Sequence, residues 1–139
     1  MKPLYFAVLL ALALYLPSCK KYIQQQEENA VVAAVTNGLW FVQEYLQNDS
    51  NITASFSGYL FKFNTNNTVV GTLNGVSVQG TWSVNISAQT ITSVFPGAPL
   101  PLRDLNETWK ITDSYTNFVV ANSTDTVYST TNVLQLQKQ

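Results

Sequence analysis

Few side chains of this 139-residue chain could carry chemistry, and the missing types narrow the choice as much as those present. The chain has no histidine and a single cysteine, Cys19. Metal sites built on imidazole or on thiolates are therefore excluded, as are nucleophile systems that pair serine or cysteine with histidine. We expect no enzyme activity, no metal and no cofactor.

Carboxylates are the remaining candidates for acid–base chemistry: Glu44, Asp49, Asp104, Glu107, Asp113 and Asp125. A glycosidase would need two of them facing each other across a cleft about 5–10 Å wide. Most lie at inferred strand ends or turns, where solvated acids are common. Glu44 differs because it shares one face of the predicted first strand with Trp40 and Val42. We expect it either at a rim or as a polar group inside a ligand cavity.

The residues before Cys19 form the pattern of an export signal that ends at this cysteine. Lys2 precedes an apolar run over residues 4–16, which suits a secretory signal and is shorter than the ~20 residues that span a bilayer. Leu16-Pro17-Ser18-Cys19 resembles a lipobox, the motif that lipoprotein signal peptidase recognises. The resemblance implies that residues 1–18 are removed and that the thiol and the freed amino group of Cys19 are acylated. An ordinary secretory signal with a chance cysteine and an uncleaved anchor are the alternatives.

Cysteine usage agrees with this interpretation, since a lone cysteine in an exported chain cannot form an internal disulfide. More than one acyl chain gives stable membrane attachment. We therefore expect a membrane partner at Cys19 and a location in the cell envelope. The outer membrane is favoured because no aspartate follows Cys19 to resemble the inner-membrane retention signal. The periplasmic face is favoured because surface-export signals of related lipoproteins place acidic residues close behind the cysteine, and Glu27-Glu28 lie farther along.

The elements that must position these residues follow from the composition. The net charge is −1 and no basic cluster exists beyond Lys20-Lys21, which argues against nucleic-acid binding. Asparagine, threonine and serine alternate with valine and aromatic residues, a mixture that favours strands and turns. We predict a tether over 19–35, with a short helix over 30–37 capped by Asn29 and ended by Gly38, and one domain over 36–139. A first strand is the alternative to the helix.

Strand signals recur every 8–12 residues from Gly38 onwards, as in sandwiches and barrels. They predict strands over 39–46, 59–63, 68–73, 76–84, 89–95, 107–113, 116–122 and 131–137. Asn74-Gly75 predicts a type I′ hairpin turn, and Gly80 predicts a bend or bulge. Three prolines make 96–101 a loop, to which 103–105 adds a helical turn.

Short connections in sequence order favour an all-β, antiparallel up-and-down barrel of about eight strands. A seven- or eight-strand sandwich is the rival, but 96–106 is the only connection long enough for a Greek-key crossing.

Several short motifs resemble the small lipocalin-like lipoproteins of Bacteroidetes-type bacteria over about residues 36–138. Gly38-Leu39-Trp40 opens the first strand as Gly-x-Trp does in lipocalins, and Gly58–Phe63, Asn66–Thr68, Gly80–Val84 and 134–138 fit the same pattern. The resemblance implies an eight-stranded barrel that holds one small apolar ligand, with Trp40 packed beneath a cation of the last strand at the closed end. Lys138 is the cation available, and it lacks the planar fork of arginine.

Seven aromatic residues are candidates for lining a ligand pocket or filling the core, and a packed core is the expectation for strands this short. They are Trp40, Tyr59, Phe61, Phe63, Trp82, Trp109 and Phe118. Asp125-Thr126-Val127 is similar to the O-glycosylation sequon of such envelopes, which makes Thr126 a candidate.

The expected function is that of a lipid-anchored, lipocalin-like binding or accessory protein of the envelope, with a small hydrophobic ligand or an envelope protein as partner. The alternative is a structural or interaction lipoprotein with a filled core that acts through loops 47–57 and 96–105.

Overall fold

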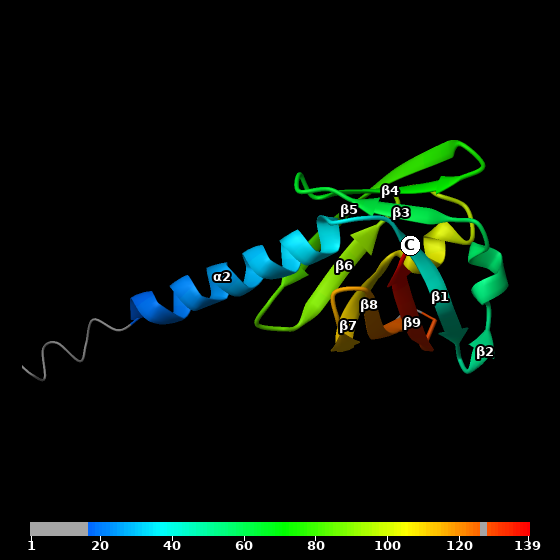
Figure 1. Cartoon of the computed structure of the whole chain (residues 1–139). Coiled ribbons are helices and arrows are strands. Elements are labelled where there is room, and N and C mark those ends of the chain that lie inside the picture. Colours follow the sequence, from blue (N-terminus) through cyan, green and yellow to red (C-terminus); the bar gives the residue numbers. More distant parts are fainter. Residues whose placement is uncertain (1–16, 126–127) are drawn as a thin grey trace, which may run out of the picture.

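The structure is a computed structural model that describes residues 17–125 and 128–139. Its sheet has the order β2-β1-β3-β4-β5-β6-β7-β8-β9, and β1 also pairs with β9. Because β2 adds to β1 alone, the other eight strands close into the predicted antiparallel up-and-down barrel (Figure 1). The bounds are β1 Trp40–Gln47, β2 Ser50–Asn51, β3 Leu60–Phe63, β4 Thr68–Leu73, β5 Val76–Asn85, β6 Thr90–Val94, β7 Glu107–Ser114, β8 Phe118–Asp125 and β9 Thr130–Lys138.

One α-helix precedes the barrel in the described residues. This helix, α2, runs from Pro17 to Thr36 and is much longer than predicted. Lysine, glutamine and glutamate are good helix formers, and they extend the helix through residues 20–29. Asn29 is therefore inside the helix rather than at its N-cap, and its side-chain oxygen accepts a hydrogen bond of 3.2 Å from Gln25 Nε2. Gly38 follows the helix with φ of 91°, as expected of a terminating glycine.

Gly75 and Gly80 are required for different reasons, one for its backbone conformation and the other for lack of space. Asn74 and Gly75 have φ of 51° and 79°, which confirms the type I′ turn. Gly80 does not form a bulge, because β4 and β5 pair without a shift across it. A Cβ at Gly80 would instead overlap the carbonyl oxygen of Val94 and lie 2.9 Å from the Phe95 ring. Glycine is needed at this position of β5 because Val94 of β6 and the following Phe95 approach the backbone closely.

The bulges lie elsewhere and decide which side chains point inward. The register of β1 against β9 shifts between Val42 and Glu44. An extra residue in one strand reverses the alternation beyond it, so Tyr45 rather than Glu44 faces the core, and Tyr45 is completely buried. The prediction that Glu44 shares the face of Trp40 and Val42 is therefore wrong. A second shift lies between Ile111 and Asp113 in β7.

Both ends of the barrel are covered. At one, here called the helix end, Val35 of α2 belongs to the core cluster. At the other, the loop end, the 96–106 loop carries the short 3₁₀ helix η3 (Leu102–Leu105), which confirms the predicted turn, and the 3₁₀ helix η2 (Thr53–Phe56) packs nearby. Strand β6 runs between the two ends. Of the helices in the described residues, none is long and apolar enough to cross a membrane.

Candidate functional site

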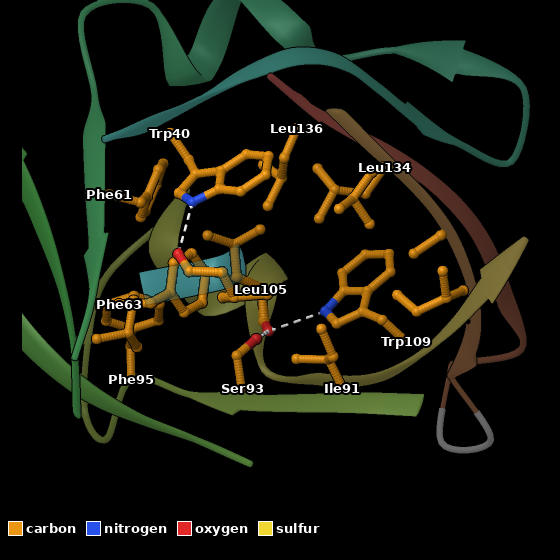
Figure 2. Close-up of a pocket in the computed structure, with 15 residues that line it drawn as sticks. Trp40, Phe61, Phe63, Ile91, Ser93, Phe95, Leu105, Trp109, Leu134 and Leu136 are labelled. Carbon is orange, nitrogen blue, oxygen red and sulfur yellow. Dashed lines mark hydrogen bonds between the residues drawn. The ribbon is translucent and has the colours of Figure 1, made fainter. Parts of the chain in front are cut away.

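The barrel interior is filled with side chains, and the remaining cavity is about 60 Å³ (Figure 2). Apolar side chains from α2, seven strands and η3 line it, and Ser93 is the polar member of the lining. An engineered cavity that binds benzene measures about 150 Å³, and ligand sites measure about 300–1,000 Å³. The expected packed core is thus present.

The seven predicted aromatic residues occupy four kinds of position. Trp40, Phe61, Phe63 and Trp109 line the cavity. Trp82 is buried but does not line it, because its indole packs edge-on against Phe63 and donates a 2.9 Å hydrogen bond to the Asn64 carbonyl. Tyr59 is half-buried and stacks on Phe61 with 5.9 Å between ring centroids.

Phe118 is the member that was wrongly assigned to the interior. Val119, Ala121 and Ser123 of β8 are the inward positions, since Val119 and Ala121 line the cavity and Ser123 is buried. Strand alternation therefore places Phe118 on the outer surface. There its ring lies 5.0 Å from that of the exposed Tyr115.

At the loop end, the 96–106 segment is tied to the barrel rather than displayed. Leu102 and Leu105 are buried, with exposed fractions of 1% and 6%. The carbonyl of Leu105 accepts hydrogen bonds from Ser93 Oγ at 2.5 Å and from Trp109 Nε1 at 3.4 Å (Figure 2). The Tyr45 hydroxyl donates to the carbonyl of Asp104 at 2.8 Å. The expectation of a freely exposed 96–105 loop is wrong for this second half.

At the helix end, two side chains of the barrel donate hydrogen bonds to the last turn of α2. Trp40 Nε1 donates to the Val35 carbonyl at 2.8 Å, and Lys62 Nζ donates to the Thr36 carbonyl at 2.5 Å. Lys138 lies over Trp40 with Nζ 5.0 Å from the ring centroid. The expected pair of Trp40 and Lys138 is therefore in contact, in the geometry of a cation–π interaction.

A groove of about 550 Å³ runs between α2 and the barrel at this end. Five of its lining residues also line the interior cavity: Val35, Trp40, Ile91, Ile111 and Val119. Its rim is polar, with Asn85, Gln89 and Thr90 on the β5–β6 hairpin. Gln24 of α2 reaches this hairpin and donates to Ser87 Oγ at 3.0 Å. A further recess of about 560 Å³ lies where β1 and β3 diverge beside η2.

The carboxylates of Asp104, Glu107 and Asp125 lie close enough at the loop end to influence one another. Burial raises the pKa of Glu107, and the charges of Asp125 and Asp104 raise it further. Burial also raises the pKa of Asp104, and Arg103 opposes this shift. Burial, with smaller contributions from Asp104 and Glu107, raises the pKa of the Tyr45 hydroxyl. Over the described ranges, no cluster of acidic, histidine or cysteine side chains could hold a metal ion.

Two buried polar side chains near the loop end, those of Ser123 and Asn132, were not predicted from the sequence. Asn132 is 2% exposed and its Nδ2 donates to Ser123 Oγ at 3.1 Å, while its Oδ1 has no hydrogen-bond partner among the described residues. Their inward position could have been read from the alternation with Leu134 and Ala121. Of the modification candidates, the backbone of Cys19 lies in the first turn of α2, and Thr126 lies outside the described residues.

Of the comparisons with known proteins, the one with solved structures supports the barrel fold. The chain matches no protein-family model and none of the curated proteins. It is similar to a DUF4847 family protein from Bacteroides vulgatus ATCC 8482, whose crystal structure was determined at 1.00 Å resolution. The TM-score is 0.55 and the identity 15%, over 78% of this chain and 99% of that one. At this identity the likeness shows the barrel fold alone.

Proposed function

We propose that this protein is a lipid-anchored accessory protein of the bacterial cell envelope, which acts through the outer surface of a filled, lipocalin-like barrel. The observation that carries the proposal is the interior space of about 60 Å³ beneath two covered ends. That space is below the size at which apolar cavities bind even benzene. A rigid module fits this interior better than an internal ligand carrier.

The surface available for contacts at the loop end follows from burial. Leu100 is 57% exposed, and Ser50 and Asn51 of β2 are exposed. Phe56, Leu102 and Leu105 are buried in the same two segments and are unavailable to a partner. We therefore assign the contact role to residues 48–51 and to 96, 97, 99 and 100, since Ala98 is buried in the core cluster.

Photo-crosslinking in intact cells tests this assignment. A photoreactive amino acid at Leu100 and, separately, at Ser50 is expected to capture the same envelope protein. The matched control is Ala88, which is exposed in the β5–β6 turn at the helix end. Capture of no defined protein from either loop position, or equal capture from Ala88, would contradict the assignment.

A small apolar ligand in the groove beside α2 is the second candidate function. The groove has the volume of a ligand site, and its floor of valine and isoleucine is bordered by polar groups that include Glu27. Native mass spectrometry after incubation with envelope lipids tests it. Ala34→Trp should fill the groove and abolish retention, while Ala121→Val, inside the barrel, should not. Absence of any retained lipid would remove this candidate.

A further inference from the structure

We propose that the first turns of α2 form a membrane-contact surface, on which Tyr22 and Ile23 lie against an anionic bilayer while the barrel occupies the opposite side of the helix. This inference rests on the proposed lipid anchor at Cys19 and adds the orientation that the anchor gives to the barrel.

The start of α2 carries exposed apolar side chains that nothing in the described part of the chain covers. Residues 20–30 are all exposed, and Tyr22 and Ile23 have exposed fractions of 67% and 55%. Figure 1 shows this part of α2 extending away from the barrel. Tyrosine is enriched at membrane–water interfaces, where its ring meets lipid and its hydroxyl meets water.

The position of these two residues around the helix is set by the contacts of α2 with the barrel. Gln24 hydrogen-bonds to the β5–β6 hairpin, and Val31 and Val35 pack on the core, so these positions mark the barrel-facing side. At about 3.6 residues per turn, Tyr22 and Ile23 lie roughly 120–140° around the helix from Val35. They therefore point away from the barrel.

The anchoring position lies on that same outer side. Position 19 precedes Tyr22 by three residues and Ile23 by four, the spacing that places helix positions on one side. An acyl chain attached there would enter the bilayer on the side where the two apolar side chains point. The barrel would then be held above the membrane on the other side of the helix.

Charge complementarity favours a lipid surface over a protein as the occupant. Lys20 is exposed at the border of the outer side, about 60° around the helix from Ile23, whereas Lys21 lies on the barrel-facing side. Long lysine stems can cover apolar surface and still place the ammonium group in the headgroup layer. A lysine near an anionic bilayer strengthens binding by about fivefold. No acidic residue lies in this turn, since the first are Glu27 and Glu28.

An environment-sensitive fluorophore on an introduced cysteine tests the orientation in the lipidated protein on anionic vesicles, where an acylated Cys19 cannot be labelled. Ile23→Cys reports the outer side. Lys21→Cys is the matched control, at nearly the same height but on the barrel-facing side. We expect a blue-shifted emission at position 23, quenched by lipids that carry a quencher at headgroup depth, and water-like emission at position 21.

Equal insertion of both positions, or of neither, would overturn the proposal. Flotation of the vesicles separates this outcome from failure of the anchor: protein that does not float refutes the proposed function, whereas floating protein with a water-exposed position 23 refutes this inference alone. Protection of position 23 in a lipid-free Cys19→Ser dimer would assign the surface to a second copy and would also overturn it.

Discussion

Replacing Leu102 by alanine should destabilise the barrel severely, because this side chain closes the loop end from within. Leu102 is 1% exposed, and a Cβ built at Gly71 of β4 would lie 3.3 Å from its Cδ2. Removal of a buried leucine side chain costs about 2–5 kcal/mol, and more where the surroundings cannot collapse. Here the loop is fixed by the hydrogen bonds of Leu105 with Ser93 and of Asp104 with Tyr45, so the cavity should persist. We expect the upper half of that range.

The measurements are urea and thermal unfolding of the chain from residue 19, with serine at that position to exclude the proposed acylation. Leu100→Ala is the matched control, two residues away in the same loop but 57% exposed, and it should change the unfolding free energy by about 0.5 kcal/mol or less. For Leu102→Ala, the midpoint of thermal unfolding should fall by about 10–20 °C. Similar small losses in both variants would refute the conclusion that the loop plugs the barrel.

Four further outcomes are expected. Gly80→Ala should lower the unfolding free energy by about 1–3 kcal/mol because the new methyl group overlaps backbone, whereas Gly71→Ala meets a phenylalanine ring at 3.1 Å that can shift and should cost less; equal losses in urea would contradict this. Because the pKa of Glu107 is raised in the folded state, the charged carboxylate disfavours folding. The free energy of unfolding therefore falls as the pH rises above 4.5, the ordinary pKa of this carboxyl group. Glu107→Gln should therefore be more stable than the parent at pH 7 and equal to it near pH 3, and thermal melts that show no difference at pH 7 would argue against it. Lys138→Met should remove about 0.5–1 kcal/mol of cation–π stabilisation, and Lys138→Arg should retain it; identical unfolding curves for both would show that the contact contributes nothing. Cys19→Ser should move the protein from membranes to the soluble fraction or block its processing, and membrane fractionation after normal cleavage would contradict the anchor.

The strands were predictable because their signal is local. Alternation of apolar and polar residues and the Asn74-Gly75 turn placed all eight barrel strands within a few residues of their bounds. The up-and-down connectivity followed from short loops. The two-residue strand β2 carried no such pattern, and it exists because Asn48 and Asp49 adopt φ of 48° and 64° in a tight turn.

What sequence reasoning missed depends on contacts between distant residues. The bulge between Val42 and Glu44 has no glycine or proline to mark it, so the switch from Glu44 to Tyr45 could not be read locally. Burial of Leu102 depends on how a proline-rich segment folds back over the barrel end. Four of the seven predicted aromatic residues line the cavity, and Trp82 is buried beside it. Phe118 lies outside because Val119 and Ala121 take the inward positions of β8.

The pairing of the first barrel strand with the last has a consequence for biogenesis. β1 obtains its long partner only when β9, from Thr130 to Lys138, is available. A ring that needs its last segment cannot close on a chain still in transit, and closing so long a loop is slow. For the export proposed above, such a topology would delay folding until translocation is nearly complete.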